Sequence, residues 1–278
     1  MSSAGKFPRT KDLPSQSTLF WVTHKDRYLR QLLIEDIEAE TNRCLIVYFT
    51  DCDHTNAQID VGDDVHLVEL LNQCAGRPVD LLLETNGGAT DATEKLCSIL
   101  RAMAPDLRVI VPRRAKSNGT VLTMCGQTVV LGMESELGPI DPAIGGVPAH
   151  FVLNAPAGSF NAIEFQLAQT ARAQTEKLAK NLLKTGMMKH RTQQEIDDTI
   201  GKLATRNEFH SHGSVIDYKE AGELGFDVTF LNHSSVIWKK LWLLRAMYQY
   251  DCSLGGYAKM FESAGVSTGT AISNPTKP

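Results

Sequence analysis

The predicted fold rests on two stretches of sequence, DLLLETNGGAT at residues 80–90 and RVIVPRRAKSNGT at residues 108–120. In each stretch a short apolar run leads into a tight glycine-bearing turn, and a helical pattern follows the turn. A helix N-terminus presents backbone N–H groups without intrahelical partners, which is where a developing oxyanion is stabilised. The second turn also carries Ser117 where the strand direction breaks, and a serine on such a turn is a candidate nucleophile.

Strand and helix patterns alternate on both sides of these turns. Residues 44–49, CLIVYF, have no polar interruption, which is typical of a strand buried on both faces. Helical spacing follows at 65–74, and further strands are expected at 79–83, 107–111 and 129–131. This order predicts a largely parallel sheet with crossover helices, and the catalytic groups of such a sheet gather at the carboxyl ends of its strands.

The second half of the chain is predicted to be mainly helical. Helices are expected at 162–184, from a T-x-x-E capping box at Thr192 to 203, at 219–224, and from Ser234 to about Tyr250, with a strand at 226–230. We expect one domain with additional C-terminal helices, flanked by two flexible ends. The boundaries that follow from the pattern are a flexible arm at 1–18, the domain at 19–262 and a flexible tail at 263–278.

Composition excludes several classes of protein. A formal net charge of -4 argues against a general nucleic-acid binder. No apolar run reaches the length of a membrane span, and residues 1–16 have no apolar signal segment, so we expect a soluble cytoplasmic protein. The six cysteines contain no CxxC pair and are interpreted mainly as small buried hydrophobes. We expect neither a metal site nor a cofactor.

The two turns together carry the groups that acyl transfer requires. Gly87 and Gly88 lack a Cβ, so the backbone can approach a substrate closely. Asn118 follows the serine and would offer a second N–H from the helix start. Either turn alone could be an ordinary strand-to-helix connection. A phosphate cradle is disfavoured because no Walker lysine and no G-x-G-x-x-G is present.

Three motifs in this order resemble one known family. TNGG at 85–88, AKSNGT at 115–120 and LGPIDP at 137–142 are similar to motifs of the serine dehydrogenase proteinase family. These are ClpP-class serine peptidases, related to signal peptide peptidase A. The resemblance runs from about residue 29 to about residue 230. It implies a ClpP/crotonase-like α/β fold of stacked strand–strand–helix units with a largely parallel sheet.

The resemblance also implies roles for individual residues. Ser117 matches the family nucleophile, and the N–H groups of Gly88 (or Gly87) and Asn118 match the oxyanion hole. His212 matches a histidine that these proteins often carry before an E-A-x-E-L-G helix. The implied substrate is a peptide or protein.

The sequence leaves the identity of the catalytic base open. Relatives often carry a lysine where this chain has Asn154, and an amide cannot act as a general base. The candidates are His212, His150, His210 and Lys177. A histidine suits neutral pH, whereas a lysine needs desolvation to lose its proton.

The leading hypothesis is therefore a soluble serine peptidase that forms an acyl-enzyme on Ser117. An alternative is a catalytically impaired pseudo-peptidase that serves as an oligomeric interaction scaffold. A third is an acyl-CoA enzyme of the crotonase type. The resemblance implies a homo-oligomer, because peptidases of this fold assemble, and the C-terminal helix offers an apolar face. On that helix Trp238 and Trp242 lie four residues apart, a pair that is typical of either a core or an oligomer contact.

Overall fold

The structure is a computed structural model that describes residues 17–54 and 56–272 of the 278-residue chain. Most of the expected N-terminal arm, residues 1–16, lies outside the described residues, as do residues 273–278 of the expected tail. The helices are α1 (Thr18–Thr23), α2 (Lys25–Thr41), α3 (Asp63–Cys74), α4 (Thr90–Met103), α5 (Asn118–Thr123), α6 (Ala149–Asn154), α7 (Ala162–Thr185), α8 (Gln193–Leu203), α9 (Tyr218–Glu223) and α10 (Val236–Gly255). The strands are β1 (Cys44–Thr50), β2 (Val79–Glu84), β3 (Leu107–Val111), β4 (Arg114–Ala115), β5 (Thr128–Leu131), β6 (Glu136–Leu137), β7 (Ala143–Ile144), β8 (Val147–Pro148), β9 (Val228–Phe230), β10 (Tyr257–Glu262) and β11 (Ser267–Ala271).

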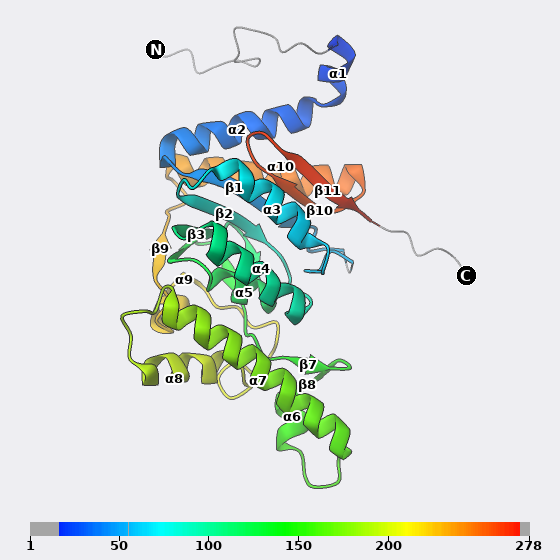
Figure 1. The fold of residues 1–278 in the computed structure, drawn as a ribbon, viewed down its shortest axis with the longest axis vertical. Coiled ribbons are helices and arrows are strands. Elements are labelled where there is room, and N and C mark those ends of the chain that lie inside the picture. Colours follow the sequence, from blue (N-terminus) through cyan, green and yellow to red (C-terminus); the bar gives the residue numbers. More distant parts are fainter. Residues whose placement is uncertain (1–16, 55, 273–278) are drawn as a thin grey trace, which may run out of the picture.

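A seven-stranded sheet in the order β11-β10-β1-β2-β3-β5-β9 forms the centre of the molecule (Figure 1). The strands from β1 to β9 in this order pair in parallel, and β10 and β11 pair antiparallel at one edge. The predicted α/β class with a largely parallel sheet and C-terminal helices is confirmed. Because β2 and β3 are parallel neighbours, the turns that follow them leave the sheet at the same edge.

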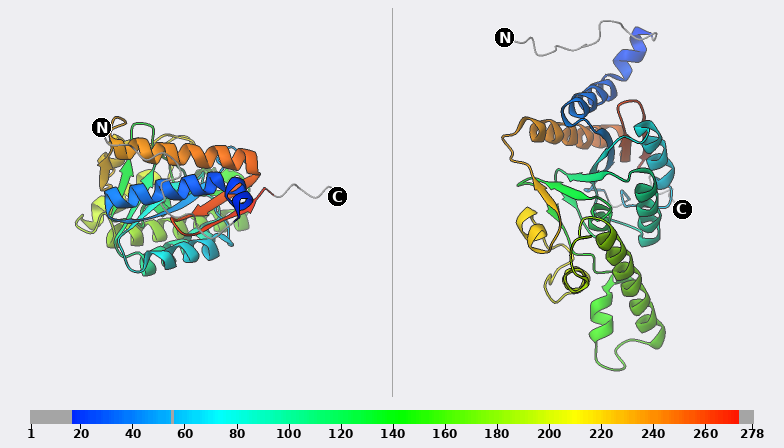
Figure 2. Two further views of the ribbon diagram at one scale, coloured as in Figure 1. Left: turned by 90° about the horizontal axis from the view of Figure 1, so that it is seen from above. Right: turned by 60° about the vertical axis from the view of Figure 1, so that its left-hand side comes forward.

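The two faces of the sheet are covered by different helices. Strand β1 shows the division, because alternate side chains enter separate cores. Cys44, Ile46 and Tyr48 pack with α3 and α4 in one core, and the intervening Leu45, Val47 and Phe49 pack with α2 and α10 in the other. Helices α2 and α10 lie side by side over their face (Figure 2). The apolar run at 44–49, which is all of β1 except Thr50, matches this burial on both sides.

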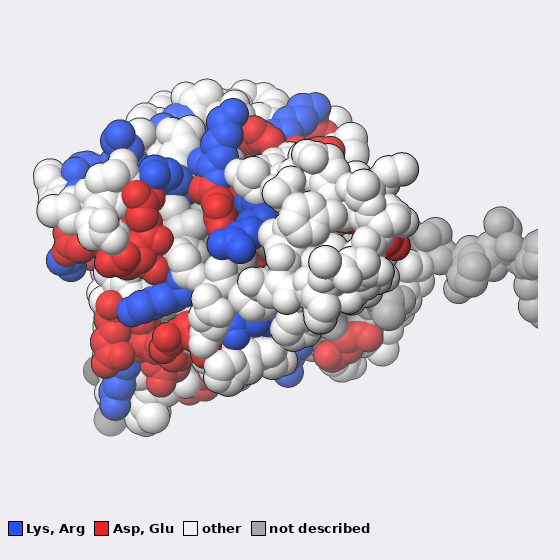
Figure 3. All heavy atoms as spheres, turned by 90° about the horizontal axis from the view of Figure 1, so that it is seen from below, with Lys and Arg blue, Asp and Glu red and all other residues white. Residues whose placement is uncertain are grey.

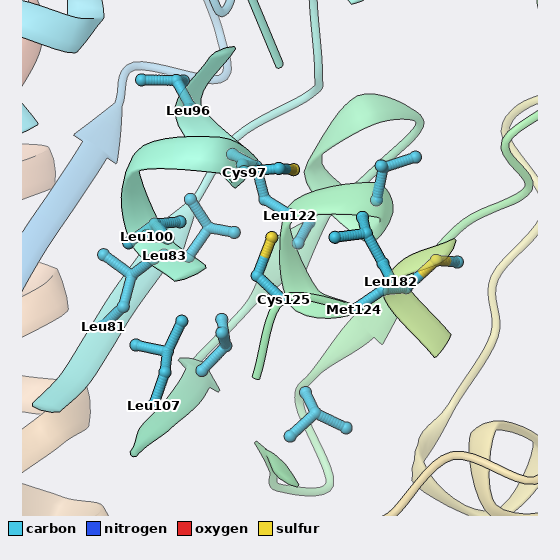
Figure 4. Packing of buried hydrophobic residues seen from close by; sticks show 14 of the residues in the cluster. Leu81, Leu83, Leu96, Cys97, Leu100, Leu107, Leu122, Met124, Cys125 and Leu182 are labelled. Carbon is cyan, nitrogen blue, oxygen red and sulfur yellow. The ribbon is translucent and has the colours of Figure 1, made fainter. Parts of the chain in front are cut away.

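The core beneath the candidate site is filled from several elements. Leucines from β2 and β3 meet α4, the segment that contains α5, and Leu182 of α7 (Figure 4). Residues 118–123, the whole of α5, are buried. This packing gives the short helix the support that its length alone could not provide.

The C-terminal region differs from the expectation in two places. The predicted flexible tail is wrong for residues 267–271, which form β11 and pair with β10. The pattern of small polar residues there is compatible with an edge strand, which needs no apolar core face. The N-cap of α10 is Ser235, whose side chain accepts the N–H of Trp238, and not the predicted Ser234.

The cysteines also differ in part from the expectation. Cys44 and Cys74 are joined as a disulfide between β1 and the end of α3. The remaining four, which include Cys52 and Cys252, are free and buried, as small hydrophobes should be. Burial raises the pKa of each of these two thiols to about 12, so neither is a reactive nucleophile at neutral pH.

A buried ion pair ties α10 to the strand that leads into the first turn. The carboxylate of Glu84, the last residue of β2, is completely buried and accepts hydrogen bonds from Nε and Nη2 of Arg245 at 2.7 and 2.6 Å. Burial raises the pKa of Glu84, whereas the guanidinium of Arg245 acts to lower it.

Replacement of Glu84 with glutamine is expected to lower the free energy of unfolding by about 3–5 kcal/mol, because the charge of Arg245 would stay buried without a counter-ion. The matched control is Glu40→Gln, which breaks the more exposed pair with Lys240 and should cost about 0–1 kcal/mol. Urea denaturation followed by circular dichroism measures both. Equal losses of unfolding free energy in the two variants would contradict the conclusion that Glu84 is a buried counter-ion required by Arg245.

Candidate active site

The two glycine-bearing turns lie side by side beyond the end of the sheet. After β2, the N–H of Thr85 donates to the carbonyl of Arg114 at 3.1 Å, and the N–H of Lys116 donates back to the carbonyl of Thr85 at 3.0 Å. These bonds continue the pairing of the two chain segments up to the residue before Ser117. The sequence predicted two separate turns, and the parallel pairing brings them into contact.

Gly87 is the point of closest approach between the turns. A Cβ built on Gly87 would lie 2.8 Å from the Cβ of Ser117 and 3.0 Å from the backbone nitrogen of Asn118. Its φ of 96° is in addition a conformation that other residues rarely adopt. Gly88 is similarly constrained, since a Cβ there would overlap the backbone of Ile59. Both glycines are therefore needed for the turns to meet.

Ser117 has a strained backbone conformation. Its φ of 53° and ψ of -123° place a residue with a side chain in a region that glycine prefers. It is the N-cap residue of α5, so the strand turns sharply into a helix at the serine. The side chain is half-buried, and among residues 17–54 and 56–272 its hydroxyl has no hydrogen-bond partner. A sharp turn of this kind presents the hydroxyl away from its own backbone.

Two backbone N–H groups beside the serine also lack partners within the described part of the chain. They belong to Gly88 and Asn118. The N–H of Gly87, the other oxyanion donor suggested by sequence, already donates to Oγ1 of Thr85 at 3.1 Å. Of the two glycines, Gly88 is the one whose N–H is available to a ligand.

His212 is paired with a carboxylate that the sequence did not indicate as functional. Its Nδ1 lies 2.8 Å from Oδ1 of Asp141, whose side chain is only 1% exposed. The second oxygen of Asp141 accepts Nε of Arg206 at 2.6 Å. A carboxylate partner favours the tautomer with the proton on Nδ1, and this leaves Nε2 able to accept a proton. The side chain of His212 is 44% exposed.

The loop at 137–142 and the segment around His212 border the serine turn. Oγ1 of Thr120 in α5 donates to the carbonyl of Gly138 at 2.9 Å, and Nζ of Lys116 donates to the carbonyl of Ser214, also at 2.9 Å. These contacts bring together one loop that carries Asp141 and another that carries His212. The structure has no hydrogen bond between Ser117 and His212.

Lys116, directly before the serine, is committed to other partners. Its ammonium donates to two backbone carbonyls, of Leu137 and Ser214, and lies 3.2 Å from a carboxylate oxygen of Glu136. Burial lowers its pKa, and Glu136 opposes that shift. We assign Lys116 to holding the loops against the serine turn.

The other candidate bases lie in less suitable settings. Nδ1 of His150 is buried without a hydrogen-bond partner among the described residues, and burial together with nearby arginines lowers its pKa. Nδ1 of His210 is bonded to the carbonyl of Arg206 at 3.0 Å. Lys177 is exposed on α7, and the side chain of Asn154 donates back to the carbonyl of His150. None of these three candidates is hydrogen-bonded to Asp141 in the described part of the chain, although the Asp141 charge acts to raise the pKa of His150.

Two features are absent from the described residues, a metal-binding cluster and a membrane-spanning helix. Across residues 17–54 and 56–272, no group of three or more His, Cys, Asp or Glu side chains could hold a metal ion. No helix in the same part of the chain combines the length and apolar character that crossing a membrane requires.

Comparison with known proteins gives one family and several distant relatives. A family model described as ClpP-like SDH-type serine proteinase matches residues 58–249. The uncharacterized protein MJ0137 of Methanocaldococcus jannaschii is 30% identical over 159 residues, which are 55% of this chain and 54% of that protein. MJ1495 of the same organism is 32% identical over 78 residues, 28% of this chain and 27% of that protein. The chain thus spans about half, or less, of the curated relatives that it matches.

Solved structures of ClpP1 from Listeria monocytogenes are also similar. One has a TM-score of 0.46 at 14% identity and covers 73% of this chain and 96% of its own. A mutant of the same protein has a TM-score of 0.47 at 13% identity and covers 77% and 99%.

Proposed function

Because the chain belongs to the ClpP-like SDH-type serine proteinases, we propose that it hydrolyses peptide bonds through an acyl-enzyme on Ser117. The observation that carries this proposal is the convergence of the two turns at Gly87. It sets the strained Ser117 beside the N–H groups of Gly88 and Asn118, and neither the hydroxyl nor these N–H groups have a hydrogen-bond partner among the described residues. These are the nucleophile and the two donors that acyl transfer requires.

In the proposed mechanism, Oγ of Ser117 attacks the carbonyl carbon of the scissile peptide bond while Nε2 of His212 takes the hydroxyl proton. The carbonyl oxygen becomes an oxyanion and accepts hydrogen bonds from the N–H groups of Gly88 and Asn118. When the tetrahedral intermediate collapses, the carbon–nitrogen bond breaks and His212 gives its proton to the leaving amine. A water molecule then attacks the ester by the same route and releases the carboxylic acid and free Ser117.

Asp141 supports His212 as the base. Its buried carboxylate is fixed from the other side by Arg206, so it can hold the imidazole by Nδ1 and stabilise the imidazolium that forms. The chain order would be Ser117, Asp141, His212. The His212 side chain is 44% exposed, and we propose that substrate binding shortens its distance to Ser117, since catalytic hydrogen bonds often tighten only in the complex.

The segment at residues 142–171, which follows the loop of Asp141 and is almost uncharged, indicates the kind of substrate. Between residues 142 and 171 the only Asp, Glu, Lys or Arg is Glu164. Seen from below, part of this side of the molecule is a broad surface without Lys, Arg, Asp or Glu side chains, and charged side chains cover the rest of the view (Figure 3). Within this stretch, Phe151 of α6 and Ile163 of α7 are 51% and 72% exposed. We therefore propose polypeptide substrates with apolar segments.

Labelling with a fluorophosphonate tests the proposed function, because this probe forms a covalent bond only with an activated serine hydroxyl. Peptide mapping by mass spectrometry should find the modification on Ser117 of the folded chain, and the heat-denatured chain should stay unmodified. If the folded chain is not labelled, or is labelled elsewhere, the proposal is wrong.

The surroundings of the enzyme are also proposals. Of the two tryptophans, Trp238 is buried in the core, whereas Trp242 is partly exposed on α10 beside the strongly exposed Leu243, Tyr250 and Leu254. The apolar face that includes Trp242 supports a homo-oligomer. We expect it to act in the cytoplasm. The Cys44–Cys74 disulfide is a feature that a reducing compartment disfavours, and cell fractionation decides the compartment.

A further inference from the structure

The side chain of Asn118 spans the gap between the two turns. Its Nδ2 donates to the carbonyl oxygen of Gly88 at 2.6 Å and to Oγ1 of Thr90 at 3.2 Å. Thr90 is the first residue of α4, and Asn118 is the first residue of α5. One buried amide therefore links the N-terminus of the helix after the first turn to that of the helix after the second.

Hydrogen bonds fix both peptide units around Gly88. The carbonyl of Gly87 accepts the N–H of Ile59 at 2.9 Å. In a trans peptide the C=O and N–H point in opposite directions, so the N–H of Gly88 is directed away from Ile59. In the next unit the N–H of Ala89 donates to the carbonyl of Ile59 at 2.9 Å, and the carbonyl of Gly88 is held by Asn118. Ile59 and Asn118 thus secure opposite sides of this turn.

Ile59 and Asn118 connect the first turn to different parts of the molecule. The bonds from Ile59 fix the turn relative to the polar loop after β1, and no residue of that loop takes part in the proposed chemistry. The bond from Asn118 fixes it relative to the residue that carries the second oxyanion donor. The two N–H groups that would share one oxygen are therefore joined through a single side chain.

We propose that the Asn118 side chain is a positioning residue that sets the separation of the Gly88 and Asn118 N–H groups in the oxyanion hole. This inference rests on the proposed function. It gives Asn118 two separable roles. The backbone N–H of residue 118 is present in every variant, whereas the hydrogen bond from the side-chain amide to the Gly88 carbonyl, here called the clamp, is present only with asparagine. An oxyanion hole depends on donors placed where charge develops, so a loosened clamp should weaken binding of the transition state and not of the substrate.

The test compares Asn118→Ala and Asn118→Asp with wild type on a peptide substrate. Alanine removes the clamp, and aspartate fills the same space but cannot donate to the Gly88 carbonyl. Both should lower kcat by about 100-fold while KM stays within about twofold. Affinity for a peptide boronate, which mimics the tetrahedral intermediate, should fall by the same factor as kcat.

Gln174→Ala is the matched control, since it removes another side-chain amide bond to the first turn of α4, at Asp91, and should leave kcat unchanged. Circular dichroism at the assay temperature checks that each variant is folded. Wild-type kcat in both clamp variants, or a loss confined to KM or to thermal stability, overturns the inference and leaves the proposed function standing. A wild-type chain that neither cleaves peptides nor reacts with the fluorophosphonate overturns both.

Discussion

Replacement of Ser117 with alanine should lower kcat/KM for peptide hydrolysis by about 10⁶-fold, because no other group in the proposed site can form the acyl-enzyme. The structure gives this prediction a physical basis. Ser117 keeps an unfavourable backbone conformation at the start of α5, where its Cβ lies at the close contact with Gly87. Strain of this kind persists only where the surrounding structure enforces it.

Hydrolysis of a fluorogenic peptide by purified wild type and variant measures the effect. Ser98→Ala, on the exposed surface of α4, is the control and should retain full activity. Removal of one small hydroxyl should leave the fold intact, which circular dichroism checks. If Ser117→Ala keeps its biological activity, the chain acts as an oligomeric scaffold and the peptidase proposal fails. Acyl-CoA turnover that survives the substitution would point instead to crotonase-type chemistry.

Replacement of His212 with alanine should reduce kcat/KM by a similar factor, about 10⁶-fold, because the proton of Ser117 would have no acceptor. His210→Ala is a matched control two residues away, since that ring is exposed and, within the part of the chain that the structure describes, is bonded only to the carbonyl of Arg206. Asp141→Asn should have a smaller effect, about 10⁴-fold, through loss of the correct tautomer.

The same peptide assay, extended over a range of pH, checks these three variants. A His212→Ala enzyme with wild-type activity would remove His212 as the base and leave the half-buried His150 as the candidate. Full activity in Asp141→Asn would reduce the Asp141–His212 contact to a structural bond between two loops. Loss in His210→Ala equal to that in His212→Ala would show that the loop, and not the imidazole, matters.

The sequence predicts those parts of the molecule whose stability comes from local pattern. The uninterrupted apolar run of β1 is buried on both faces, and the capping box at Thr192 begins α8 as expected. The two turns are also found where the sequence places them. In each case the residues that determine the element are adjacent in the chain.

The remaining features of the site and the fold depend on contacts between segments that are distant in the sequence. Asp141 and His212 are 71 residues apart, and nothing in the LGPIDP motif indicates which histidine its aspartate will meet. The choice of Gly88 over Gly87 as donor follows from one bond to Thr85 that only coordinates reveal. β11 is stabilised by pairing with β10, so its own small polar residues carry no strand signal.

The position of β10 has a consequence for synthesis of the protein. This strand pairs with β1. Strand β1 is synthesised early, and it can complete its pairing only after β10, one of the last strands, has left the ribosome. A nonsense mutation within α10 would spare Ser117, Asp141 and His212 and yet leave one side of β1 open to pairing with other nascent chains. Such truncated products should aggregate, and loss of function from a late stop codon would then say nothing about catalysis.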